Sequence, residues 1–103
     1  MSGSDRELVF SALGDNCRRL LLDRLRLQNG QTLSELCAGI EITRQAITKH
    51  LKVLEEANLV VTRRRGRQKQ HFLNPVPINA VAMRWLREFD AVKLDLLADA
   101  EEG

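Results

Sequence analysis

Five basic side chains fall within seven consecutive residues of the chain: Arg63, Arg64, Arg65, Arg67 and Lys69. Guanidinium and ammonium groups at this density repel one another, and the phosphate groups of a nucleic acid would neutralise them. The sequence therefore predicts that this segment contacts a nucleic-acid backbone. The alternative is a run of charges that is only solvated.

A second set of donors precedes the basic run, on a predicted helix. Ile47, Leu51 and Leu54 recur at helical spacing and are expected to face the core. The opposite side then offers amide, hydroxyl and cationic groups, which read base edges in a major groove and hold the flanking phosphates. The candidate DNA-binding residues of this helix are Thr43, Arg44, Gln45, Thr48, Lys49 and Lys52. Taken alone, such a face is equally consistent with a solvated amphipathic helix.

The cysteines and histidines form no recognisable catalytic pattern. Cys17 and Cys37 lie in separate predicted helices, and His50 and His71 are isolated histidines. No phosphate-binding glycine loop and no nucleophile–base set is present, so we predict no enzyme, no catalytic residue and no cofactor. His71 is expected to be structural, and His50 to be either structural or a DNA contact. A redox thiol with a lowered pKa remains an alternative for Cys17, near a helix start.

Short helices and a hairpin must position these residues. Capping signals predict helices that begin near residue 5 (with Ser4 as the cap), at 15 or 16, at 32 and at 43, and a last helix that begins near 78. Strand-like segments at 59–62 and 71–73 flank the basic run, and Gly66 can supply the turn. This is the order of a winged helix-turn-helix. We expect a mainly α fold with a small β-hairpin, comprising five helices and a two-stranded wing.

Length and charge agree with a nucleic-acid-binding domain. The 103 residues suffice for one domain spanning 1–103. Residues 41–73 hold eight basic and three acidic side chains, a net of +5 against +2 for the whole chain, and such clustering marks a nucleic-acid surface. No segment has the length and apolarity to cross a membrane, and no signal-peptide core is present, so the cytoplasm is the expected location.

Residues 43–60 read Thr-Arg-Gln-Ala-Ile-Thr-Lys-His-Leu-Lys-Val-Leu-Glu-Glu-Ala-Asn-Leu-Val. They resemble the recognition helix of the ArsR family of repressors, which typically reads Ser-x-x-(Ala/Thr)-(Val/Ile)-Ser-(Lys/His)-His-Leu-x-x-Leu-x-x-Ala-Gly-Leu-Val. Threonines replace the two serines and Asn58 replaces the glycine, and these changes keep the capping chemistry. Segments 13–19 and 72–75 also resemble the family, with Cys17 at the usual threonine. The resemblance covers nearly the whole chain.

The resemblance implies a bacterial, nucleoid-associated homodimer whose first and last helices form the subunit interface. The sequence supports a dimer independently, because the last helix carries more apolar surface than a small core needs. The expected interface residues are Phe10, Trp85, Phe89, Val92 and Leu96. The alternative is that they all belong to the core of one subunit.

Many members of this family sense metals through a Glu-Leu-Cys-x-Cys segment on the third helix. Here Cys37 is kept but Gly39 stands at the second cysteine, and the last helix has no histidine. One thiolate is a poor metal site, so we predict no metal site and expect Cys37 to be a small buried residue.

Together these observations predict a sequence-specific regulator that binds double-stranded operator DNA, a homodimeric repressor that does not sense metals. One alternative is a thiol- or small-molecule-responsive repressor of the same family, whose effector the sequence does not name. The other is a winged-helix module that binds protein or RNA.

Overall fold

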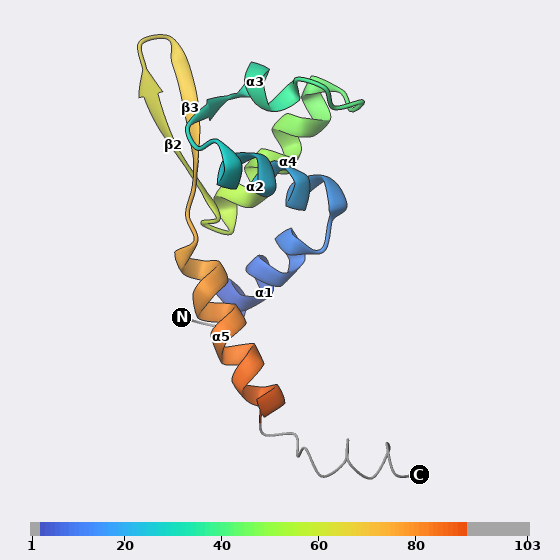
Figure 1. Ribbon diagram of the computed structural model, residues 1–103, viewed down its shortest axis with the longest axis vertical. Helices are drawn as coiled ribbons and strands as arrows, with labels where there is room; N and C mark the ends of the chain where they lie inside the picture. The colour runs from blue at the N-terminus through green and yellow to red at the C-terminus, as the bar shows by residue number, and fades with distance from the viewer. Residues whose placement is uncertain (1–2, 91–103) are drawn as a thin grey trace.

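A computed structural model describes residues 3–90 of the chain. Within this range five helices and three strands follow one another (Figure 1), in the order α1 (Gly3–Leu13), α2 (Asn16–Leu27), β1 (Gln31–Thr32), α3 (Leu33–Cys37), α4 (Arg44–Glu56), β2 (Val60–Arg65), β3 (Gln68–Leu73) and α5 (Val76–Asp90). The mainly helical, winged helix-turn-helix fold that the sequence predicts is confirmed. The wing, however, belongs to a sheet of three strands.

Side-chain caps fix where three of the helices begin. The carboxylate of Asp15 and the hydroxyl of Thr43 each accept a hydrogen bond from the backbone N–H three residues further on. Thr32 and Glu35 form a reciprocal capping box at the start of α3. The predicted cap at Ser4 is wrong, because α1 begins before it, at Gly3. The local signals were therefore reliable at α2, α3 and α4.

The wing is longer than the sequence suggested. β2 and β3 pair antiparallel from Val60↔Leu73 to Arg65↔Gln68, and Gly66 has a φ of 63° in the connecting turn. Because the strands extend to the turn, four of the five basic residues lie in strands and only Arg67 lies in the turn.

A short third strand joins the wing to the helices. β1 pairs antiparallel with β3 in the register Gln31↔His71 and Thr32↔Gln70, which gives the sheet order β1-β3-β2. His71 is buried, and its Nδ1 donates to the carbonyl oxygen of Gln31 at 3.0 Å. The predicted structural role of His71 is therefore confirmed, and the base of the wing is tied to the segment that precedes α3.

The core lies between α1, α2, α3, α4, the first half of α5 and the base of the wing. Its largest fully buried side chains are Leu21, Leu25, Leu36, Ile47, Leu54, Leu59, Val9 and Val60. Asn58, with a φ of 60°, ends the segment after α4 in the left-handed conformation predicted for it, and the chain then enters β2.

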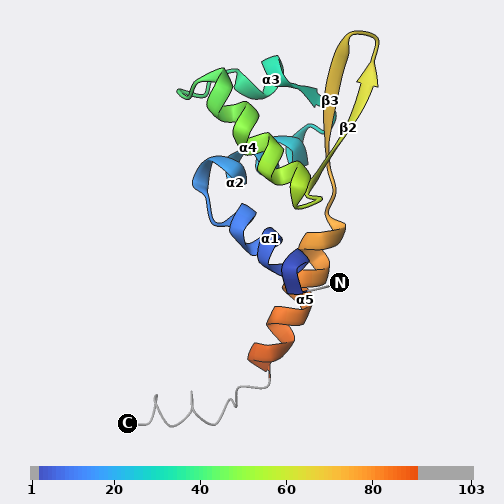
Figure 2. The ribbon, with the colours of Figure 1, turned by 180° about the vertical axis from the view of Figure 1, so that it is seen from behind.

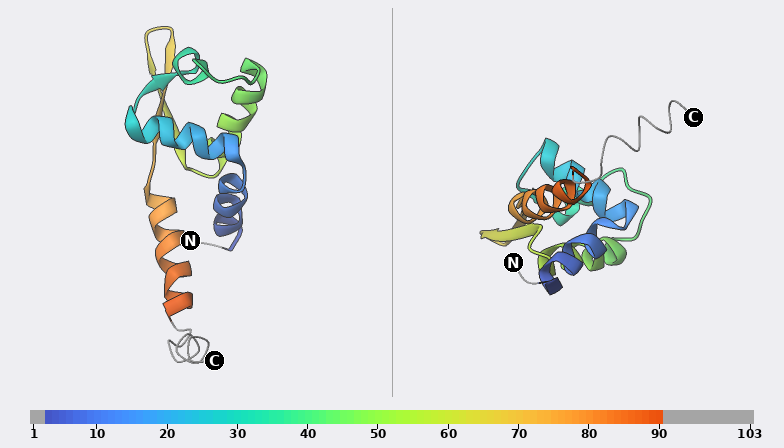
Figure 3. Two further views of the ribbon diagram at one scale, coloured as in Figure 1. Left: turned by 45° about the vertical axis from the view of Figure 1, so that its right-hand side comes forward. Right: turned by 90° about the horizontal axis from the view of Figure 1, so that it is seen from below.

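α1 and α5 lie together at the end of the molecule opposite the tip of the wing (Figure 1, Figure 3). α5 begins at Val76, two residues earlier than predicted, with Pro77 in its first turn, where a proline is tolerated. Arg6 of α1 and Glu88 of α5 form an ion pair at 3.5 Å. No helix in residues 3–90 combines the length and the apolar character needed to span a bilayer.

Candidate nucleic-acid interface

The amphipathic character of α4 decides which of its side chains reach solvent. Ile47, Leu51 and Leu54 are at most 3% exposed and pack into the core, as predicted. The side chains of the opposite face are exposed, and they are those of Arg44, Gln45, Thr48, Lys49 and Lys52. Figure 2 shows α4 in front, with the β2–β3 hairpin projecting beside it. The structure thus leaves the predicted polar face open on the side of α4 that does not pack.

Two hydrogen bonds near the start of α4 limit which donor groups this face presents to solvent. Nη1 of Arg44 donates to Oγ of Ser34 on α3 at 3.2 Å, so the guanidinium bridges the two helices of the helix-turn-helix. The hydroxyl of Thr48 donates to the carbonyl oxygen of Arg44 at 2.9 Å. Thr48 therefore presents its oxygen as an acceptor and its methyl group, whereas the sequence suggested a hydroxyl donor.

The basic residues of the wing divide between the two faces of the hairpin. Arg64 lies opposite Lys69, on one face, while Arg63 lies opposite Gln70, on the other. The guanidinium of Arg63 lies over the ring of Phe72, 5.5 Å from its centroid. Arg67 is exposed in the turn. Cationic groups therefore face more than one direction around the wing.

A groove connects the wing to α4. Nζ of Lys69 and Oε1 of Glu55 are 3.5 Å apart and form an ion pair across it. The polar lining of the groove comes from α3, α4 and the wing, and includes Ser34, Arg44, Thr48, Arg67, Gln68 and Lys69. Arg44 and Thr48 of the helix and Arg67 and Lys69 of the wing thus line one groove. The acidic partner of Lys69, 14 residues away in sequence, was not foreseen.

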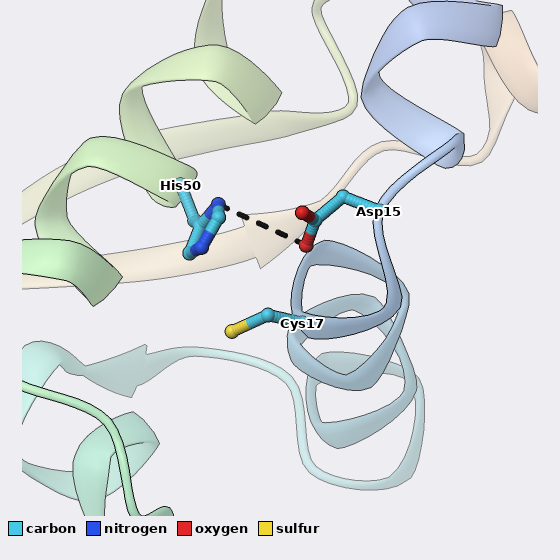
Figure 4. Close-up of side chains that lie close together, drawn as sticks. All are labelled: Asp15, Cys17 and His50. Carbon is cyan, nitrogen blue, oxygen red and sulfur yellow. Dashed lines mark ion pairs between the residues drawn. The ribbon is translucent and has the colours of Figure 1, made fainter.

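His50 points away from this surface, toward the start of α2 (Figure 4). Its Nδ1 is 3.3 Å from Nη1 of Arg18 and 3.9 Å from Oδ1 of Asp15. The backbone N–H of Arg18 donates to Asp15 and, with the positive charges nearby, holds the pKa of that carboxyl below its usual value. His50 was expected to be either a structural residue or a DNA contact, and its contacts with Arg18 and Asp15 are those of a structural residue.

Cys17 lies beside Asp15 and His50, and in the absence of a bound cation its surroundings disfavour a thiolate. Partial burial, together with the Asp15 carboxylate, raises the pKa of the Cys17 thiol. The lowered pKa considered for a redox thiol is therefore wrong. Sequence spacing does not reveal the group of Asp15, Cys17 and His50, because the histidine is on a different helix.

Cys37 lies at the end of α3 and is half-buried against the core, close to its expected place. The chain turns at Gly39, where φ is 77°, and Nη1 of Arg24 donates to the carbonyl oxygen of Leu36 at 3.1 Å. Gly39 therefore adopts the left-handed backbone conformation of the turn between α3 and α4. A metal site of the Cys-x-Cys type would need its second cysteine at this position.

Three aromatic side chains gather where α1 meets α5. The rings of Phe10 and Trp85 meet edge-on with centroids 6.0 Å apart, and those of Trp85 and Phe89 with centroids 4.8 Å apart. All three remain at least 36% exposed, as do Leu8, Met83 and Leu86. Val92 and Leu96 lie outside the described residues. Trp85 and Phe89 are therefore only partly covered within one subunit.

Comparisons with known proteins agree with this architecture. Residues 13–63 match a family model described as a helix-turn-helix domain. The chain is 41% identical over 92 residues to YuzN, an uncharacterized HTH-type transcriptional regulator of Bacillus subtilis (strain 168), covering 84% of this chain and 99% of that protein. It is 27% identical over 81 residues to the transcriptional repressor SdpR of the same organism, covering 79% and 88%. Among solved structures, an ArsR-like transcriptional regulator from Rhodococcus sp. RHA1 is 31% identical, with a TM-score of 0.74, over 96% of this chain and 92% of that one.

Proposed function

The chain belongs to the ArsR family of winged helix-turn-helix transcriptional regulators, and we propose that it is a homodimeric repressor of double-stranded operator DNA. The observation that carries the proposal is the continuous surface formed by the open face of α4, the groove and the basic wing. Amide and cationic groups on a helix of this kind read base edges, and cations on a wing hold phosphates. The protein so described is a binding protein and not an enzyme.

Within this surface we assign two roles. Arg44, Gln45 and Thr48 lie in the first turns of α4, the part of a recognition helix that reaches base edges, and we assign them to base readout. The remaining cations are assigned to phosphates, and they are Lys49, Lys52, Arg63, Arg64, Arg65, Arg67 and Lys69. Thr43 positions the helix through its cap and lies at the same end.

The partly covered aromatic side chains support the homodimer. Phe10, Trp85 and Phe89 expose apolar area on one face of α1 and α5, and a second copy of the chain would cover it. Val92 and Leu96 remain predicted members of this interface. A dimer places two copies of α4 on the two halves of a palindromic operator. We therefore propose that residues 1–103 form one DNA-binding domain with terminal helices for dimerisation.

Repression follows from the proposed mode of binding and from the likeness to SdpR, a transcriptional repressor. A dimer bound across a promoter would compete with polymerase for the same DNA, and would act in the cytoplasm at the nucleoid. Metal sensing through the α3 segment is not part of the proposal, because Cys37 has no second thiolate at Gly39. The raised pKa of Cys17 argues against the thiol-responsive alternative.

Selection of bound sequences from random duplexes tests the proposal directly. We expect an imperfect palindrome, with half-sites about one helical turn (roughly 34–36 Å) apart, bound by a dimer. Single-stranded RNA of matched length serves as the competitor. If the RNA displaces the duplex at equal concentration, or if no sequence is enriched, the module binds another partner and the proposal is wrong.

A further inference from the structure

We propose that Asp15, Cys17 and His50 form a binding site for Zn²⁺ that links the start of α2 to the middle of α4. One ligand atom from each of the three side chains lies within 4.8 Å of the other two (Figure 4). All three side chains are partly buried and therefore remain accessible to an ion from solvent. The site lies away from the DNA-facing side of α4, so it does not depend on the proposed function.

The donor set selects the metal. A thiolate, an imidazole and a carboxylate are the three ligand types that zinc uses, commonly as three protein ligands with water in the fourth position. Calcium and magnesium prefer oxygen ligands and would leave the sulfur and the nitrogen unused. The combination of one sulfur, one nitrogen and one oxygen therefore favours a borderline metal such as zinc.

The geometry requires only a small contraction. Zinc bonds of about 2.0–2.3 Å in a tetrahedron place the ligand atoms roughly 3.3–3.8 Å apart. Nδ1 of His50 and Oδ1 of Asp15 are already 3.9 Å apart. The whole group, within 4.8 Å, reaches tetrahedral spacing when the side chains move by about 1 Å, a change that rotamer adjustment supplies.

The hydrogen bonds around the group keep the ligands in place and in the correct form. Asp15 is held as the N-cap of α2 by the backbone N–H of Arg18 at 3.0 Å. The guanidinium of Arg18 can only donate, so the Nδ1 that it contacts at 3.3 Å is the acceptor nitrogen of the ring, and its lone pair becomes available to a metal once that contact opens. His50 therefore presents a metal-binding nitrogen toward Asp15.

Arg18 is the group that a metal would have to displace. Its Nε donates to the carbonyl oxygen of Ala12 at 2.8 Å and its Nη2 to that of Ser11 at 3.0 Å. These two bonds do not involve the site, so only the contact with His50 must open. Without a metal, Arg18 links α2 to α4 through its contact with His50. With a metal bound, the cation would make that link instead. The sequence predicted no metal site. The proposal departs from that prediction at Cys17 and His50 and keeps it at Cys37.

Cobalt substitution tests the site without DNA. Reduced full-length protein is titrated with Co²⁺, and we expect one equivalent per chain to give a thiolate-to-cobalt charge-transfer band and tetrahedral d–d bands, both removed by Zn²⁺. Cys17→Ser should abolish the charge-transfer band. His50→Gln and Asp15→Asn should each weaken cobalt binding at least tenfold. Asn is itself a good N-cap, so Asp15→Asn removes the anionic ligand while α2 keeps its start.

Cys37→Ser is the matched control, because it removes the other half-buried thiol from a different helix. It should leave the spectrum and the stoichiometry unchanged. Circular dichroism confirms that each variant is folded before titration. A wild-type protein without the charge-transfer band, a band that survives Cys17→Ser, or a band lost equally in Cys37→Ser would overturn the proposal.

Discussion

Arg64 and Lys69 lie directly opposite each other across the two strands of the wing, so that two cations occupy one cross-strand pair. Like charges in such a pair destabilise a hairpin, by an amount of up to about 1 kcal/mol. Glu55 of α4 lies 3.5 Å from Lys69 and offsets part of this repulsion. The remaining repulsion is consistent with the proposed contact between the wing and DNA phosphates.

Replacing Arg64 by alanine is expected to stabilise the free protein while weakening its binding to DNA. Relief of the repulsion should raise the Tm at low salt by about 1–3 °C, and the gain should shrink as salt screens the charges. The loss of one phosphate contact should lower the slope of log Kd against log salt by about 0.9. Arg26→Ala, on an exposed site of α2, is the control and should leave the slope unchanged. An unchanged slope in Arg64→Ala as well would show that this residue does not touch DNA.

Different residues on the open face of α4 should control the sequence specificity and the overall affinity of DNA binding. Gln45→Ala is expected to relax the preference for particular base pairs, at a cost of roughly 1–3 kcal/mol on the selected operator and little on other duplexes. Lys52→Ala should weaken binding to all duplexes by a similar factor. Binding measured against single-base variants of the operator distinguishes the two effects. The assignment of Gln45 fails if its variant keeps the wild-type preference profile.

A substitution at Trp85 should disrupt dimerisation and DNA binding together. Trp85 contacts Phe10 and Phe89 edge-on and is still 42% exposed, so a carboxylate at this position would be buried in a dimer without a partner. We expect Trp85→Glu to sediment as a monomer and to lose operator affinity at least tenfold. Leu27→Glu, on a residue of α2 that is 76% exposed, should change neither property. A wild-type protein that sediments as a monomer at micromolar concentration would contradict the dimer.

The capping box of α3 should give stability a measurable dependence on pH. The pKa of the Glu35 carboxyl lies below its usual value, because the backbone N–H and then the hydroxyl of Thr32 donate to it. A carboxyl with a lower pKa in the folded state stabilises the fold above its unfolded pKa, and this contribution is lost as pH falls through the folded value.

Thermal unfolding at a series of pH values tests this expectation. Wild-type protein should exceed Glu35→Gln in Tm at pH 7, and the difference should close as the pH is lowered below about 4.5, the ordinary value for this carboxyl. Glu41→Gln, in the exposed turn before α4, is the control and should show a difference that does not change with pH. A constant difference for Glu35→Gln would show that its charge does not stabilise α3.

The features that the sequence predicted well are those that depend on neighbouring residues. The cap at Thr43 needs only a hydroxyl and the N–H three residues later. The turn at Gly66 and the left-handed residue Asn58 likewise follow from backbone preferences of single residues. The polar face of α4 followed from periodicity, because a helix fixes which residues lie opposite its buried side.

Other features depend on contacts between distant segments, which periodicity does not encode. β1 has only two residues, too few to show a strand pattern, and exists because Gln31 pairs with His71 from 40 residues away. The approach of His50 to Asp15 likewise depends on how α4 packs against α2. The acidic partner of Lys69 was missed for the same reason.

Thr32 belongs to two elements at once, since it pairs with Gln70 in the sheet and caps α3. Within residues 3–90, β1 is the one strand that borders the hairpin, and it pairs only with the base of the wing. In the proposed complex, the tip near Gly66 would meet DNA without support from a third strand. A displacement of the tip on binding would pass along β3 to Gln70 and from there to Thr32, at the start of α3.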